Sequence, residues 1–143
     1  MSLEQNSNIL CEVFQQFIMH PRIDVCTEEL KGSSILDVNI LRLLKSNGEL
    51  PIKKIGKALE LSASTLGSAI KRLEKKELIK RKINSDDLRS YVICLTERGN
   101  EVISNMNKEQ QKLMKKLLSC LTEEEQNTFL ELFQRMLRTF RQG

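Results

Sequence analysis

The sequence predicts a mainly α-helical fold with a small β wing, and three observations carry that prediction. Apolar residues recur at helical spacing through most of the chain. A helix with hydroxyl groups at its start and cations behind them is expected at 62–76. Two short runs rich in β-branched residues, 79–83 and 91–95, then flank a polar segment that is too long for a two-residue turn. This order is typical of a winged helix-turn-helix.

The N-terminal part predicts two helices. The first carries apolar residues at helical spacing and ends near His20, because Pro21 follows: Ile9, Leu10, Val13, Phe14, Phe17 and Ile18. Residues 21–32 lack periodicity and predict a loop with room for one helical turn around 27–30. A capping box of Ser34 and Asp37 then starts the second helix, which Gly48 ends. Its buried stripe is expected to be Ile35, Val38, Leu41 and Leu44.

Two short helices are expected after Pro51, separated by residues 60–62. On the first, Ile55, Ala58 and Leu59 should point inward. Ser62 is the natural N-cap of the second, whose buried stripe would be Leu66, Ala69, Ile70 and Leu73. Its outer face then presents hydroxyls and cations, the groups that contact duplex DNA: Ser64, Thr65, Ser68, Lys71, Arg72 and Lys75.

The C-terminal part of the sequence predicts two more helices, and their apolar faces indicate the oligomeric state. Thr96 opens the first, with Gly99 in its first turn, and a capping box of Thr122 and Glu125 opens the second. These helices and the first helix are too apolar for one small lobe to cover, so a second copy of the chain is the expected partner. We therefore expect one domain, 1–143, with a DNA-binding lobe at 33–99 and N- and C-terminal dimerisation helices at 1–32 and 100–143.

Charge is unevenly distributed. The 143-residue chain has a formal net charge of +4. Segment 53–82 holds ten Lys and Arg residues against three Glu, a net +7, which leaves −3 for the remainder. Such segregation favours a polyanionic partner whose counterions are released on binding. A solvated lysine face is the alternative interpretation of the charge alone.

Other classes of protein are disfavoured. No apolar run reaches the ~20 residues of a membrane span, and the N-terminus lacks a secretory pattern, so we expect a cytoplasmic protein without membrane contact. The four cysteines form no CxxC pair and should be reduced. One histidine, and neither a glycine-rich phosphate loop nor a nucleophile motif, argue against an enzyme or a cofactor. His20, Cys26 and Glu28 or Glu29 match no strong zinc spacing, so no metal is expected.

Residues 36–99 resemble the multiple antibiotic resistance regulator (MarR) family. The strongest match is STLGSAIKRLEKKELIKRKINSDDLRSYVICLTERG, which follows the family's recognition helix, its L-I-x-R strand, its acidic-then-arginine wing and its L-T-x-x-G helix start. The resemblance implies base-edge and backbone contacts to DNA for Ser62, Ser64, Thr65 and Ser68, and phosphate contacts for Lys71 and Arg72. It implies minor-groove insertion for Arg89, oriented by Asp87.

Two positions depart from the family pattern. Leu88 stands where many members have a second wing arginine, which weakens or shifts the expected minor-groove contact. Glu77 stands where the family often has glycine at the end of the recognition helix. A left-handed backbone there would cost a non-glycine residue roughly 1 kcal/mol, so this helix is expected to end one residue differently.

The resemblance implies a homodimeric transcription regulator, most often a repressor, on a pseudo-palindromic operator. A small phenolic or lipophilic effector would release it. Two alternatives stay open: a winged helix used for protein–protein contact, and a thiol-based redox sensor acting through Cys11. No cation neighbours Cys11 in sequence, and the tyrosines of the thiol-sensing relatives are missing, so we expect Cys11 to be a small hydrophobe buried at the dimer face.

Overall fold

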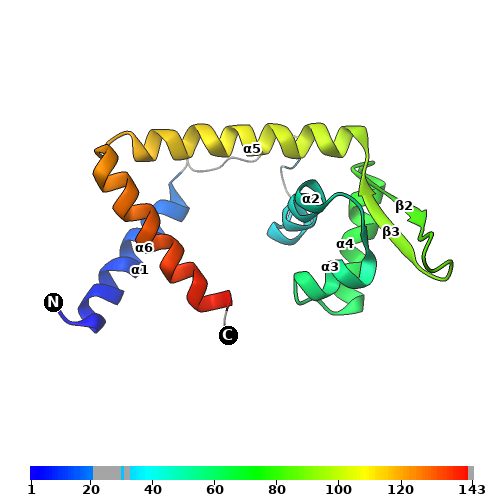
Figure 1. Cartoon of the computed structure of the whole chain (residues 1–143), viewed down its shortest axis with the longest axis horizontal. Coiled ribbons are helices and arrows are strands. Elements are labelled where there is room, and N and C mark those ends of the chain that lie inside the picture. Colours follow the sequence, from blue (N-terminus) through cyan, green and yellow to red (C-terminus); the bar gives the residue numbers. More distant parts are fainter. Residues whose placement is uncertain (21–29, 31–32, 142–143) are drawn as a thin grey trace. The chain divides into compact units, whose positions relative to one another are not determined.

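The computed structural model describes residues 1–20, 30 and 33–141. Its elements, all labelled in Figure 1 except β1, are α1 (Leu3–Met19), α2 (Ile35–Asn47), β1 (Leu50–Pro51), α3 (Ile52–Ala58), α4 (Ala63–Lys75), β2 (Ile79–Ile83), β3 (Tyr91–Leu95), α5 (Glu97–Leu118) and α6 (Glu123–Arg141). The chain divides into two compact units. We call residues 24–108 the winged-helix unit, and residues 1–23 with 109–143 the helical unit. The loop predicted for 21–32 lies outside the described residues, apart from Leu30.

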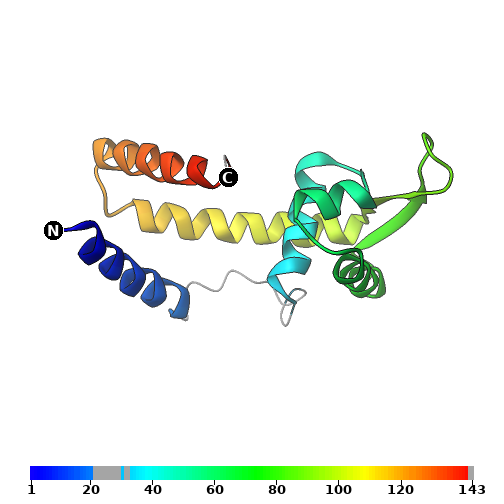
Figure 2. The same cartoon turned by 90° about the horizontal axis from the view of Figure 1, so that it is seen from below.

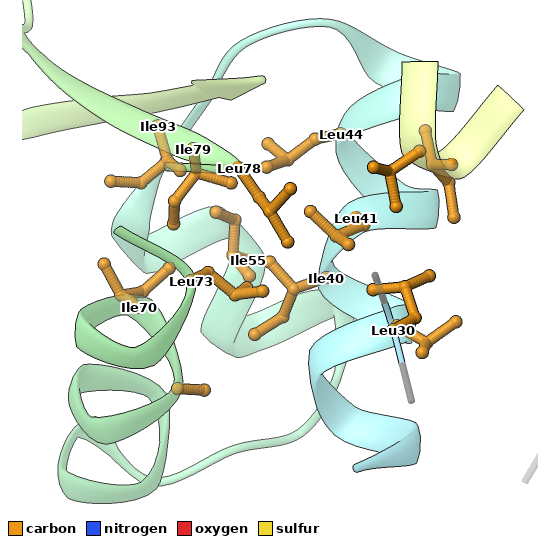
Figure 3. Packing of buried hydrophobic residues seen from close by; sticks show 14 of the residues in the cluster. Leu30, Ile40, Leu41, Leu44, Ile55, Ile70, Leu73, Leu78, Ile79 and Ile93 are labelled. Carbon is orange, nitrogen blue, oxygen red and sulfur yellow. The ribbon is translucent and has the colours of Figure 1, made fainter. Parts of the chain in front are cut away.

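The winged-helix unit has a closed hydrophobic core. Figure 3 shows side chains from α2, α3, α4 and the sheet meeting there, with Leu41 and Ile55 fully buried. The buried stripe predicted for α4 is confirmed at all four positions: Leu66, Ala69, Ile70 and Leu73. Close packing of this kind makes each side chain sensitive to truncation.

Two predicted core positions are wrong. Ile35 is 81% exposed, because the buried face of α2 is centred on Ile40, Leu41 and Leu44, and Ile35 in the first turn lies off that face. Ala58 is exposed as well, since the seven-residue helix α3 buries Ile55 and turns its last residue outward. The remaining predicted positions on these two helices are buried or packed against the core.

Three antiparallel strands form the sheet, in the order β1-β3-β2. The two wing strands have the bounds that the sequence predicts, and they pair from Ile79↔Leu95 to Ile83↔Tyr91. The sequence does not predict the two-residue strand β1, because it is too short to show alternation and contains Pro51. Its place at the sheet edge fits the missing N–H of proline.

Helix α4 ends in a left-handed residue, Glu77, with φ 60°. The Glu77 N–H donates to the carbonyl of Glu74 at 2.9 Å, and the Leu78 N–H donates to the carbonyl of Leu73 at 3.0 Å, which is a complete Schellman motif. The expectation that this helix ends differently is therefore wrong. Burial of Leu78 offsets the backbone cost of a non-glycine residue. Glu60 ends α3 in the same way, with φ 53°.

The start of α5 explains the L-T-x-x-G pattern. The Thr96 hydroxyl accepts from the N–H of Gly99 at 3.0 Å and donates to the carbonyl of Glu77 at 2.6 Å. A Cβ atom at Gly99 would clash with the carbonyl oxygen of Leu78, so only glycine fits this close approach. The helix start predicted at Thr96 is confirmed, and the Thr96 hydroxyl ties the start of α5 to the end of α4.

The helical unit contrasts with the winged-helix unit because none of its described residues is buried. Figure 2 shows α1 and α6 on either side of the distal part of α5. The predicted capping box of α6 is confirmed: Glu125 N–H donates to the Thr122 hydroxyl at 3.2 Å, and Thr122 N–H donates to the Glu125 carboxylate at 2.9 Å. A second box, Ser2 with Gln5, begins α1 and is not among the predicted caps. Among the described residues, no helix is long and apolar enough to cross a membrane.

Candidate nucleic-acid interface

Helix α4 presents a stripe of free polar side chains. Ser64, Ser68, Lys71 and Lys75 are all exposed, and their spacing of four, three and four residues places them on one helical face. Within the described part of the chain, none of these four side chains makes a hydrogen bond or an ion pair. Small hydroxyls and flexible ammonium groups are therefore available to a partner along about three turns of helix. We call these four residues the α4 stripe.

Two of the predicted contact residues serve the helix itself. The Ser62 hydroxyl accepts from the backbone N–H of Thr65 at 3.2 Å and lies 2.9 Å from the Thr65 hydroxyl, to which it donates. This confirms Ser62 as the N-cap of α4. Ser62 and Thr65 thus fix the start of the helix and hold each other's hydroxyls.

Arg72 is engaged by a buried carboxylate. Its Nε lies 3.3 Å from Asp37 Oδ2, and its Nη2 lies 2.8 Å from Asp37 Oδ1. Asp37 is 2% exposed and is the one charged residue in the core of the described chain. The hydrogen bond to Asp37, together with the charge of that carboxylate, raises the pKa of Arg72 above its ordinary value, while desolvation acts the other way. The sequence indicates only a capping role for Asp37, because nothing in it links this residue to Arg72.

The wing loop is ordered by its own polar groups. The Asn84 N–H donates to the carbonyl of Ser90 at 3.0 Å, which closes the loop. The Asp87 carboxylate accepts from the backbone N–H of Arg89 at 3.0 Å, so Asp87 orients the backbone of Arg89. Within the described residues, no ion pair restrains the Arg89 side chain, which is exposed beside Leu88. Figures 1 and 2 show this loop projecting beyond the sheet.

Arg81 joins the wing to α4, a role that the sequence does not reveal. Its Nε donates to Glu74 Oε1 at 2.8 Å, and its guanidinium carbon lies 5.8 Å from the ring centroid of Tyr91. The ion pair and the cation–π contact place one arginine between the helix and strand β3. In the sequence Arg81 is only one cation of the basic segment, because its partner Glu74 is seven residues away.

The structure neutralises part of the basic segment. Three of its ten cations pair with carboxylates, in Arg72–Asp37, Arg81–Glu74 and Lys82–Glu49. Lys71 and Lys75 of the α4 stripe are not among the paired cations. The positive surplus is therefore carried by lysines that remain free to meet phosphates.

The described cysteine and histidine residues form no metal site. Among the described residues, no cluster of His, Cys, Asp and Glu is arranged to hold a metal ion. Cys26, Glu28 and Glu29, considered as ligands with His20, lie outside the described residues. In the single chain, Cys11 and Cys120 are exposed, and Cys94 is buried. The burial expected for Cys11 depends on a second copy of the chain.

Known proteins are similar to this chain in sequence or in fold. The MarR family model matches residues 34–91. YwhA, a helix-turn-helix transcriptional regulator of Bacillus subtilis, is 34% identical over 97 residues, which are 68% of this chain and 70% of YwhA. A second such regulator of this organism, YpoP, is 30% identical over 128 residues, which are 90% of this chain and 88% of YpoP. The transcriptional repressor MdtR of the same organism is 32% identical over 97 residues, 68% of this chain and 63% of MdtR.

Among solved structures, Streptococcus pneumoniae FabT in complex with DNA has a TM-score of 0.84 at 16% identity, and the alignment covers 99% of each chain. This similarity concerns the fold. The higher sequence identity to YwhA and YpoP, together with the match of the family model, indicates common descent. The chain belongs to the MarR family of winged helix-turn-helix transcriptional regulators.

Proposed function

We propose that the chain acts as a homodimer that binds duplex DNA through α4 and the wing and represses transcription. The observation that carries this proposal is the α4 stripe, with two hydroxyls and two unpaired lysines on one exposed face. A wing whose Asp87 carboxylate accepts from the backbone N–H of Arg89, and whose Arg89 side chain has no ion pair among the described residues, extends from the same unit. The similarity to the repressor MdtR supports repression, and the similarity to FabT, which was solved in complex with DNA, supports DNA binding.

In the proposed complex, α4 lies in the major groove. Ser64 and Ser68 meet base edges or the backbone, and Lys71 and Lys75 meet phosphates. Arg89 on the wing enters an adjacent minor groove, where narrow A·T tracts concentrate negative potential. Ser62, Thr65 and Asp87 hold the helix start and the wing in shape.

The helical unit supports the dimer. Most of its apolar side chains on α1 and α6 are about half exposed or more in the single chain, among them Phe14 at 58% and Phe133 at 56%. A water-exposed surface of this kind needs a partner. A second copy would cover it and would present two α4 helices about 34 Å apart, one helical turn of DNA.

Salt dependence tests the DNA contact. If about six to ten phosphates are contacted, affinity for a mixed-sequence duplex should fall by roughly 10³–10⁵ between 50 and 200 mM salt. The variant Lys71→Ala/Lys75→Ala should bind more weakly. The slope of the logarithm of its affinity against the logarithm of the salt concentration, which we call the salt slope, should be smaller. The control Lys112→Ala/Lys116→Ala removes the same charge from α5 and should leave the slope unchanged. A flat response in the unmodified protein would favour the protein-contact alternative.

The wing has its own test. Arg89→Ala should weaken binding, mainly at A·T-rich flanks, because the narrow minor groove there is what attracts an arginine. The melting temperature should not change, since the wing lies outside the core. Equal affinity of both proteins for A·T-rich duplexes would show that the wing is not used.

Two finer expectations remain predictions from the family resemblance. One is release of DNA by a small phenolic or lipophilic effector. The other, the alternative to effector control, is a thiol switch at Cys11. Peroxide should leave DNA binding intact if Cys11 is structural. Peroxide-induced release that is abolished in Cys11→Ser would assign a redox sensor instead.

A further inference from the structure

The ion pair between α2 and α4 has two features that a surface salt bridge lacks. Asp37 has a side chain that is 3% exposed, whereas Arg72 is 48% exposed at the surface of α4. The contact is side-on, because Nε and Nη2 of the guanidinium each meet one carboxylate oxygen. A side-on pair fixes the plane of the guanidinium as well as its location.

This contact leaves one edge of the guanidinium free. Arginine has five N–H donors, of which the Asp37 carboxylate takes one on Nε and one on Nη2. Among the described residues, Nη1 donates to no acceptor. The exposed part of Arg72 therefore includes donors that are already oriented by a partner beneath them.

Asp37 itself is held firmly. Its backbone N–H donates to the Ser34 hydroxyl at 3.2 Å in the first turn of α2, where the helix dipole favours a carboxylate. The same helix buries Ile40, Leu41 and Leu44 in the core. Asp37 is therefore anchored to the hydrophobic core of the winged-helix unit.

The location of Arg72 matches the DNA-facing surface. It lies four residues after Ser68, so the two residues are neighbours one turn apart on α4. Stability alone does not explain a buried carboxylate here, because the cost of desolvating Asp37 offsets much of its attraction to the exposed Arg72. We propose that Asp37 is a positioning residue, which holds the Arg72 guanidinium so that Nη1 of Arg72 can donate to a DNA phosphate. This inference rests on the proposed DNA binding.

Binding to a mixed-sequence duplex tests this proposal, because phosphate binding does not depend on sequence. Asp37→Asn should lower affinity roughly tenfold, the size of one charge-assisted hydrogen bond, although it makes the protein more positive. The salt slope should fall by about 0.9 for each phosphate that the protein no longer neutralises. Glu74→Gln is the matched control, since it removes the same charge from a carboxylate that binds Arg81. That variant should retain the wild-type slope.

Arg72→Lys supplies a second variant in case Asp37→Asn does not fold. Lysine keeps the charge and can pair with Asp37, but its single ammonium lacks the second oriented edge. We expect its affinity and slope to fall as in Asp37→Asn, and we expect no additional decrease in the double variant. A purely structural role for Asp37 would lower the melting temperature and leave the salt slope unchanged.

The outcomes separate this inference from the proposed function. If the unmodified protein shows no salt-dependent DNA binding, the proposed function fails, and the inference fails with it. If the unmodified protein binds but Asp37→Asn or Arg72→Lys keeps the wild-type slope, only the inference is overturned.

Discussion

The two units of this chain reach stability in different ways. Every buried residue in the described part of the chain lies between Leu30 and Met106, within the winged-helix unit. The helical unit has amphipathic helices and local capping but no buried side chain among its described residues. The first unit buries its hydrophobic residues within one chain. In the second, the apolar side chains stay exposed within the single chain, and the proposed dimer would bury them by association.

Truncation should give the largest effect. A fragment of residues 24–108 should unfold cooperatively and stay monomeric, because it contains the whole core. Deleting residues 122–143 from the full chain should instead cause aggregation, since α1 and α5 then lose part of their apolar cover. Sedimentation and circular dichroism of both proteins measure this difference. A soluble, well-folded monomer of the full chain at micromolar concentration would contradict the proposed dimer.

Single truncations of side chains sharpen the same contrast. Leu73→Ala should destabilise the winged-helix unit by about 2–5 kcal/mol at any protein concentration, because Leu73 is fully buried. Phe133→Ala removes a ring that is 56% exposed and stacks on Phe129. Its effect should grow as the protein is diluted, since it weakens association. Chemical denaturation at two concentrations separates the two cases, and a Phe133→Ala effect independent of concentration would contradict association through α6.

Sequence periodicity predicts the winged-helix unit well for a physical reason. The buried stripe of α4 and the two wing strands are set by local patterns of burial that repeat every few residues. The prediction for Ile35 is wrong because a helix end does not show which side faces the core. The pairs Asp37–Arg72 and Glu74–Arg81 depend on tertiary placement, which side-chain type alone does not encode.

The helix end at Glu77 shows tertiary packing overriding a backbone preference. The buried side chain of Leu78 and the two Schellman hydrogen bonds hold a glutamate at φ 60°. Glu77→Gly should therefore stabilise the protein by about 1 kcal/mol, because glycine adopts this backbone without steric cost. Glu60→Gly is the parallel variant at the end of α3. A loss of stability on thermal unfolding of both variants would show that the glutamate side chains contribute more than their backbone costs.

The smallest effect concerns a local contact of the helical unit. Hydrogen bonds from the backbone and the hydroxyl of Thr122 lower the pKa of Glu125 below its ordinary value of 4.5. The stabilisation of the start of α6 is therefore present above that value and is lost as the pH falls through the lower, folded-state pKa. In an NMR titration, the Thr122 amide should shift with a midpoint below the ordinary carboxyl value of 4.5. Glu125→Gln keeps an acceptor for the cap but should abolish this transition. A Thr122 midpoint at the ordinary value of 4.5 would mean that the capping box is not populated in solution, and the helical unit would then rely on association even for the start of its last helix.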